Sequence, residues 1–125
     1  MDKHIVRAYL DEKYLWNAKH IAKCHGISLN DYIAVVYYII AHEGTIPTEL
    51  LIECPHQNNT TRICASVNLD IYNAAYVVLS EASLTDSDFV RMISYYISHN
   101  NKLPLSPLEY RKKYLKRQNY FIINI

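Results

Sequence analysis

The 125-residue chain contains only two glycines and four prolines. Long flexible linkers and glycine-rich phosphate-binding loops both need more glycine than this, so the composition disfavours both. Half of the residues are hydrophobic, yet no apolar run approaches the roughly 20 residues that cross a bilayer. A chain of this size can bury one modest core, and we expect a compact, mostly helical domain without a membrane segment.

Cysteine is scarce as well. Cys24, Cys54 and Cys64 are an odd number without framework spacing, so we expect reduced thiols. The first residues, MDKHIVRAYLDE, lack the basic and apolar regions of a signal peptide. No acidic, Ser, His or Cys residues fall into a recognised catalytic spacing. We therefore expect a cytoplasmic binding protein that is not an enzyme and needs no cofactor.

Histidine and cysteine also raise a metal hypothesis. His20 and Cys24 are one helical turn apart, and Cys54 and His56 follow later in the chain. These four are ligand types that zinc accepts. The paired C-x-x-C spacing of structural zinc sites is missing, so no metal site is predicted.

What the chain does contain is an internal repeat at an offset of 57 residues. Residues 27–48 read ISLNDYIAVVYYIIAHEGTIPT, and residues 84–105 read LTDSDFVRMISYYISHNNKLPL. The identical pairs are Asp31/Asp88, Tyr38/Tyr95, Ile40/Ile97, His42/His99 and Pro47/Pro104. Two copies of one small unit in one chain predict an intramolecular pseudodimer.

A run with period-two alternation precedes each copy, at residues 4–10 and 62–69. Each run reads as a half-buried strand. A lone strand leaves backbone groups unpaired, so we expect the two runs to pair antiparallel as a ribbon with one face on a four-helix core. That is the architecture of a ribbon-helix-helix dimer, here built from one polypeptide.

Two helices are predicted after each strand. The first helices are expected at about 12–25 and 71–82, capped by Asp11 and Asp70. On this alignment the strands are offset by 59 residues, and the first helix of the second copy is two residues shorter. Gly26 is expected to adopt the left-handed conformation that ends the first helix. The inner faces are predicted to carry Leu15, Ala18, Ile21 and Ala22, then Ala74, Ala75, Val78 and Leu79.

The second helices open with similar chemistry in both copies. Ser28 and Thr85 are each followed three residues later by an acid, which is close to a capping box. Both helices are expected to stop before a proline, near Gly44 and near residues 100–101. The predicted division of the chain is residues 1–50, first unit; 51–60, connector; 61–105, second unit; and 106–125, basic C-terminal helix and tail.

The stretch VRAYLDEKYLWNAKHIAKCHGISLNDYIAVVYYIIAHEGTIP resembles the RelB/DinJ branch of ribbon-helix-helix antitoxins. The likeness lies in the strand ending, the helix length, the Gly-hydrophobic-Ser/Thr turn and the terminal Gly-x-hydrophobic-Pro. It covers residues 5–47, and residues 63–104 more weakly, because the second copy lacks the turn glycine. Members of this family dimerise through the strand and helices, bind operator DNA with the ribbon, and neutralise a RelE-like ribonuclease toxin with a C-terminal extension. The resemblance implies a DNA-binding repressor of a toxin–antitoxin system.

A two-stranded ribbon fits the DNA major groove. There Arg7 can donate two hydrogen bonds to guanine and Asn68 can pair with adenine. The resemblance adds the start of the first copy's second helix as a phosphate contact, whereas Asp86 and Asp88 at the equivalent start would repel a phosphate. The predicted DNA-binding residues are Ile5, Arg7, Tyr9, Ser28, Asn30, Arg62, Ser66 and Asn68. Because the copies differ, we expect an asymmetric DNA site; alternatively, the strand residues are only solvated.

The tail of residues 106–125 differs from the rest in charge. It carries five Lys or Arg and one Glu, a net charge of +4 in a chain of net +1, which leaves −3 for the other residues. RelE-like toxins are usually basic, so such a tail matches one poorly. It can grip nucleic acid, dock on an acidic protein or form a solvated helix with its tyrosines on the core. The predicted partner-binding residues of the tail are Tyr110, Arg111, Lys112, Lys113, Tyr114, Lys116, Arg117, Tyr120 and Phe121.

Two functions therefore stay open from the sequence. The first is an antitoxin-type repressor that binds double-stranded DNA and possesses a protein partner such as a toxin. The second is a protein inhibitor or adaptor, of the kind found in phages and mobile elements, that binds a macromolecular target through the scaffold and tail. Further association of two pseudodimers stays open as well.

Overall fold

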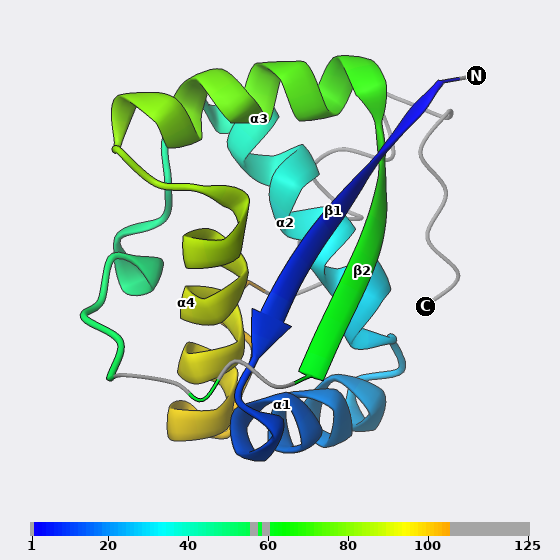
Figure 1. Cartoon of the computed structure of the whole chain (residues 1–125), viewed down its shortest axis with the longest axis vertical. Helices are drawn as coiled ribbons and strands as arrows, with labels where there is room; N and C mark the ends of the chain where they lie inside the picture. Colours follow the sequence, from blue (N-terminus) through cyan, green and yellow to red (C-terminus); the bar gives the residue numbers. More distant parts are fainter. Residues whose placement is uncertain (1, 56–57, 59–60, 106–125) are drawn as a thin grey trace.

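Two antiparallel strands cross in front of four helices in the computed structural model, which describes residues 2–55, 58 and 61–105 (Figure 1). The elements in chain order are β1 (Lys3–Leu10), α1 (Glu12–Cys24), α2 (Leu29–Glu43), the short 3-10 helix η1 (Thr48–Leu50), β2 (Thr61–Asn68), α3 (Leu69–Glu81) and α4 (Asp86–Asn100). The prediction of a mostly helical chain with a two-stranded antiparallel ribbon is confirmed. The predicted basic helix and tail lie outside the described residues.

The two strands pair in the predicted orientation, with Val6 opposite Ala65 and Arg7 opposite Cys64. Successive side chains of a strand point to opposite faces. The side chains of one face are buried in the core, and they are Val6, Ala8, Leu10, Ile63, Ala65 and Val67. The other face points away from the helices, as the alternation predicts.

The helices pack across the two halves of the chain rather than within them. α1 packs mainly against α4, and α3 packs mainly against α2. In the same way α2 lies against β2, and α4 lies against β1 (Figure 1). Each half therefore covers the apolar surface of the other, and we expect neither half to fold alone.

α2 lies deepest in the core. Every residue from Tyr32 to Ile40 is buried, so this helix is apolar on all sides rather than along one stripe. The predicted inner side chains of α1 are buried. In α3 the prediction holds for Ala75 and Leu79 but is wrong for Ala74, which is exposed, because the buried stripe is centred on Ile71, Tyr72, Ala75 and Leu79.

One offset of 57 residues relates the two halves throughout, which corrects the predicted offset of 59. α1 and α3 are both 13 residues long, so the prediction of a shorter second helix is wrong. The predicted cap Asp70 is also wrong, because Asn68 precedes α3 and its Oδ1 accepts the N–H of Asp70 at 2.9 Å. In α1 the predicted cap Asp11 accepts the N–H of Lys13 at 3.0 Å. A capping oxygen must lie just before the helix to reach these amides, and Asp70 lies within the first turn.

The turn between the helices is also the same in both halves, although only the first has a glycine there. Gly26 has φ +79° and Ser83 has φ +58°. The N–H of each donates to the carbonyl three residues earlier, at 2.9 Å for Gly26 and 3.0 Å for Ser83. The next residue, Ile27 or Leu84, donates to the carbonyl five residues earlier, which completes a Schellman motif. Ser83 thus holds a left-handed backbone that favours glycine.

A partly buried carboxylate, that of Asp86 in α4, joins three helices from both halves of the chain. The hydroxyl of Tyr37 in α2 donates to Asp86 Oδ1 at 2.5 Å, and that of Tyr72 in α3 donates to Asp86 Oδ2 at 2.7 Å. Burial raises the pKa of both tyrosines, and the neighbouring Asp86 carboxylate raises it further. The equivalent position of the first half is Leu29, so the repeat alone does not predict this network.

We predict that Ser83→Gly stabilises the protein. A left-handed non-glycine residue costs about 1–2 kcal/mol, and the extra entropy of an unfolded glycine returns about 0.4–1 kcal/mol of that. The expected gain in the free energy of unfolding is therefore about 0.5–1 kcal/mol, measured by urea denaturation. Gly26→Ser is the matched control and should lose a similar amount. Destabilisation by Ser83→Gly would contradict the assigned turn.

We predict that Asp86→Ala lowers the free energy of unfolding by about 2 kcal/mol, because two buried hydroxyls lose their acceptor. A double-mutant cycle with Tyr37→Phe isolates the contact, since the phenylalanine has no hydroxyl to leave unpaired. The loss caused by Asp86→Ala should shrink in that background. Strictly additive effects of the two substitutions would show that the hydrogen bond contributes nothing.

Candidate nucleic-acid interface

The outward side of the two strands forms one continuous surface, which we name the ribbon face. It consists of Lys3, Ile5, Arg7, Tyr9, Arg62, Cys64, Ser66 and Asn68. These residues lie opposite one another in pairs, such as Ile5 with Ser66 and Tyr9 with Arg62. Ile5 is 37% exposed and Tyr9 is 51% exposed. Neither strand contains an Asp or Glu, so the charged groups of the ribbon face are all cations.

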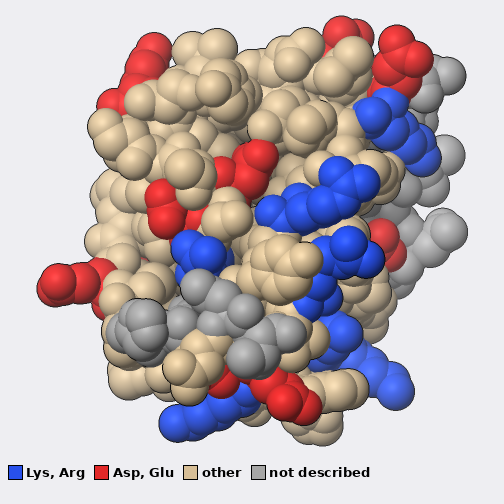
Figure 2. Space-filling view, viewed as in Figure 1, with Lys and Arg blue, Asp and Glu red and all other residues tan. Residues whose placement is uncertain are grey.

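The pleat brings six of the predicted DNA-binding residues together on this face. Five of them are exposed, namely Ile5, Arg7, Tyr9, Arg62 and Ser66, and Asn68 is half-buried. Figure 2 shows Lys and Arg side chains along the ribbon in the view of Figure 1. Lys3 belongs to the same face but precedes the predicted strand, and the alternation extended by one residue would have included it.

Asn68 and Asn30 have structural contacts that limit a direct role in reading bases. Oδ1 of Asn68 accepts two amides of α3, and a two-bond contact to adenine needs this oxygen as well as Nδ2. Nδ2 of Asn30 donates to the carbonyl of Cys64. Asn30 thereby ties the start of α2 to β2. Both side chains position elements that flank the ribbon face.

Ser28 caps α2, because its hydroxyl accepts the N–H of Asp31 at 3.1 Å. An open groove of about 540 Å³ lies beside this helix start. Its walls are Lys19 and Lys23 of α1 and residues 26–30 of the turn. We name it the α1–α2 groove. The sequence prediction included Ser28 and Asn30 of this groove but neither of the two lysines.

The start of α4, which is the equivalent place in the second half, carries two acids, Asp86 and Asp88, where the start of α2 carries one, Asp31. Asp88 closes a capping box with Thr85 and lies 3.5 Å from Arg91. Nε of Arg91 also donates to the backbone carbonyl of Tyr9 at 3.3 Å. With Asp86 between the two tyrosines, both carboxylates have partners. Figure 2 shows acidic side chains on the α4 side of the ribbon, whereas Lys and Arg side chains follow the ribbon itself.

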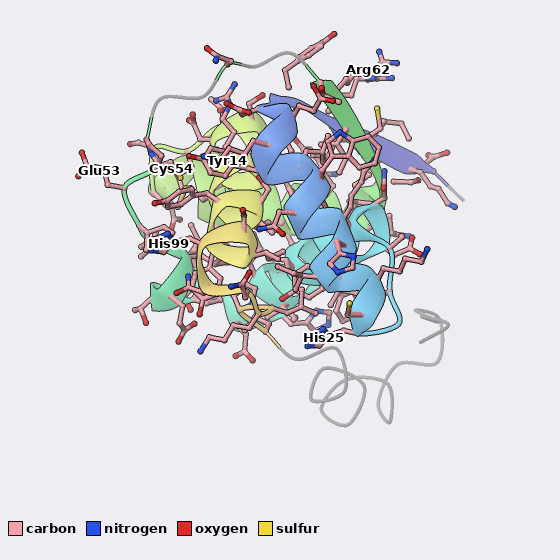
Figure 3. The ribbon with its side chains drawn as sticks, turned by 90° about the horizontal axis from the view of Figure 1, so that it is seen from below. Tyr14, His25, Glu53, Cys54, Arg62 and His99 are labelled. Atoms are coloured by element: carbon pink, nitrogen blue, oxygen red, sulfur yellow. The ribbon has the colours of Figure 1, made fainter. Side chains whose placement is uncertain are left out.

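The residues of the metal hypothesis are partly described. His20 Nε2 and Cys24 Sγ are 3.8 Å apart on α1, whereas His56 lies outside the described residues. Burial raises the pKa of the Cys54 thiol. Figure 3 places Cys54 well away from Arg62 and from His25. Within the described part of the chain, no three His, Cys, Asp or Glu side chains gather as metal ligands do.

Among residues 2–55, 58 and 61–105, none of the helices combines the length and the apolar character needed to cross a bilayer. The longest, α2 and α4, have 15 residues each, against roughly 20 for a span.

The chain presents three surfaces of different chemistry: the ribbon face, the α1–α2 groove and the acidic start of α4. No protein family model matches the chain, and no curated protein or solved structure matches it either. The function of these surfaces therefore follows from their charge, exposure and contacts.

Proposed function

We propose that the chain is a tandem ribbon-helix-helix pseudodimer that binds double-stranded DNA through its ribbon face and acts as an antitoxin-type transcriptional repressor. The observation that carries the proposal is the ribbon face itself. It is a two-stranded antiparallel surface that carries Lys3, Arg7 and Arg62 and no acid.

The pseudodimer part of the proposal is supported by the exchanged packing. In a symmetric dimer of strand–helix–helix units, each helix pair covers the partner's strand and helices. Here the two halves of one chain have that relation, since α1 packs on α4, α3 packs on α2, and each second helix lies under the other half's strand. The equal helix lengths, the caps Asp11 and Asn68, and the left-handed residues Gly26 and Ser83 all recur at the same offset.

The DNA part is supported by chemistry on the ribbon face. Arginine is the side chain best suited to guanine in the major groove, because its fork donates to both O6 and N7. Arg7 lies near the middle of β1 and opposite Cys64. Tyr9 and Ile5 offer apolar contact to a thymine methyl group. Because the facing strand offers Arg62, Cys64 and Ser66 instead, the preferred DNA site should not be palindromic.

We predict that Arg7→Ala reduces affinity for the preferred duplex about 10- to 100-fold, since a two-bond contact to guanine contributes about 1–3 kcal/mol of discrimination. The measurement is fluorescence anisotropy at physiological salt, with a duplex from upstream of the protein's own gene and a scrambled duplex. Arg7→Ala should bind the two duplexes almost equally. Lys102→Ala, which removes an exposed cation after α4, is the control and should keep the preference. Equal, weak binding of both duplexes by the unmodified protein would refute sequence reading by the ribbon.

A protein partner such as a toxin is the remaining part of the antitoxin proposal. The predicted partner-binding residues of the tail lie outside the described residues. Within the described part, α3 offers an exposed surface of another kind. Tyr76 and Val77 are each 55% exposed, and Leu51 after η1 is 53% exposed. Leu51 also lines an open groove of about 280 Å³ together with Val78, Glu81 and Ala82 of the second half and Gly44, Thr45 and Ile46 of the first.

This exposed apolar surface favours a second candidate function, that of a protein-binding inhibitor or adaptor. Exposed apolar side chains gathered in one place are typical of interaction sites. At the equivalent positions of α1 the first half has Lys19 and His20 in place of Tyr76 and Val77. At these two positions the exposed face of α1 is therefore polar, whereas that of α3 is apolar.

The second candidate predicts that a photo-crosslinking amino acid at Val77 forms a discrete protein adduct in cells, whereas the same amino acid at His20 forms none. His20 is the matched control, because it is exposed at the equivalent position. The adduct should disappear when the substitution Tyr76→Lys is added to the variant that carries the crosslinking amino acid at Val77, because the lysine places a charge on the apolar surface. Equal crosslinking at the two positions would remove the support for an α3 docking surface.

A further inference from the structure

We infer that the chain's own basic segment, residues 106–125, binds the open groove that Leu51 lines together with residues 44–46 and the end of α3. We name this space of about 280 Å³ the α3–η1 groove. The inference goes beyond the proposed function, because it requires neither DNA nor a second protein. Residues 106–125 lie outside the described part of the chain, and their chemistry is read from the sequence.

The first argument is the apolar surface of the groove and of the helix beside it. Leu51 is 53% exposed. On the α3 wall Val78 is half-buried and Ala82 is exposed. Val77, which directly precedes Val78, is 55% exposed, so the apolar area continues from the groove onto the outer face of α3. Contiguous apolar area of this kind indicates a surface that another segment covers.

The second argument is the segregation of charge along the chain. Residues 24–61 contain no Lys or Arg, and neither do residues 63–90. Each of these stretches contains four Asp or Glu residues. Together the two stretches supply every wall of the α3–η1 groove. The groove therefore lies in the part of the molecule where acids have no neighbouring cations in the sequence.

Acidic side chains lie at the groove itself. Glu81 of α3 lines it, and Glu49 and Glu53 stand two residues before and after Leu51. All three are exposed, and Figure 3 shows Glu53 at the outer surface. In Figure 2 the left edge of the described molecule, from the end of α3 to the segment after η1, carries acidic and no basic side chains. An apolar groove with an acidic rim suits a segment that combines apolar and cationic side chains.

The third argument is the composition of residues 106–125. Five Lys or Arg and one Glu give this segment a net charge of +4, against −3 for the rest of the chain. Leucines and tyrosines are interleaved with the cations, in the order Leu108, Tyr110, Arg111, Lys112, Lys113, Tyr114, Leu115, Lys116 and Arg117. The segment thus has both properties that the groove selects.

The fourth argument is the length of chain available. The hydroxyl of Tyr32, near the start of α2, donates to the carbonyl of Leu105 at 2.7 Å and accepts its N–H at 2.9 Å. The groove lies by Gly44 at the other end of α2, about 18 Å away at 1.5 Å per helical residue. Twenty residues span up to about 66 Å when extended, so residues 106–125 can reach the groove of their own chain.

Attachment to the same chain also favours this segment over other occupants. A tethered segment is present at an effective concentration of the order of 1 mM, so weak exposed ion pairs are sufficient to hold it. A second copy placed on the groove by a two-fold axis would instead bring acids against acids. The consequence is a docking surface that the chain itself covers, so another protein must displace residues 106–125 before it contacts the groove.

The test uses the full chain with a photo-crosslinking amino acid in place of Tyr114. The protein is illuminated at several low concentrations, and the crosslinked peptides are identified by mass spectrometry after digestion. We expect crosslinks within one chain that join position 114 to residues 44–51 or 78–82. Raising the salt from about 0.1 M to about 1 M shortens the Debye length from about 10 Å to about 3 Å, so the yield of these crosslinks should fall.

A pair of charge-reversal variants shows whether the acids of the groove hold the segment. Glu49→Lys/Glu81→Lys should lower the yield at least about fivefold, because one exposed ion pair shifts an equilibrium by up to about fivefold. Asp2→Lys/Glu12→Lys is the matched control, since it changes the net charge by the same amount before β1 and on α1, and it should keep the yield. Circular dichroism verifies that the variants are folded.

The outcomes separate this inference from the proposed function. Crosslinks to other surfaces, or an unchanged yield in Glu49→Lys/Glu81→Lys, would overturn the inference. Adducts of twice the chain mass that persist at the lowest concentration would identify the segment of a second copy as the occupant and would overturn the contact within one chain. None of these results depends on DNA, so they leave the proposed function to its own anisotropy experiment.

Discussion

Backbone hydrogen bonds between β1 and β2 join the two halves of the chain along a ribbon whose inner face covers α2 and α4. A single short strand cannot satisfy its own amides and carbonyls, and an isolated hairpin in water is only marginally stable. The ribbon therefore requires the helices beneath it, and the helices require each other across the halves. Because α2 packs against β2 and α3 of the other half, it is buried on all sides. Among the described residues, the four long helices all lie on one side of the ribbon, so none of them covers its other face (Figure 1).

The two halves have the same order of elements and the same helix lengths, but their side chains differ. Helix lengths, caps and turns recur at a constant offset, and Ser83 even adopts the left-handed conformation that Gly26 adopts without strain. Asp86, which is partly buried, occupies the position of the buried Leu29, and two tyrosine hydroxyls donate to its carboxylate. Removing one partner of such a contact leaves the other without its hydrogen bond, which is destabilising. The second half therefore has a polar contact between three helices that the first half fills with Leu29.

The exposed side chains of the two halves differ as well. Lysines lie along α1 and arginines along the ribbon, whereas α3 presents Tyr76 and Val77 and the start of α4 presents two acids. Long-range attraction to a polyanion depends on the summed charge of a surface. A molecule with one positive and one acidic or apolar end is suited to two partners of unlike chemistry. We propose the ribbon face as the surface that binds DNA and the outer face of α3 as the surface that binds a protein.

The sequence by itself determined the local structure, because local structure depends on near neighbours. Alternation at residues 4–10 placed Val6 and Arg7 on opposite faces, and Ser28 and Thr85 marked the starts of α2 and α4. The repeat implied that two equivalent units share one ribbon. Only the tertiary structure decided which oxygen caps α3, where Asn68 prevails over Asp70, and that Asn30 binds the carbonyl of Cys64. It also decided that Asp86 meets two tyrosines and that Lys19 and Lys23 line a groove with residues 26–30. The Asn30 and Asp86 contacts join residues 14 to 49 positions apart in the chain, so no pattern of neighbouring residues specifies them. The cap of α3 and the groove involve nearer residues, but they depend on where β2 ends and on how α1 packs beside α2.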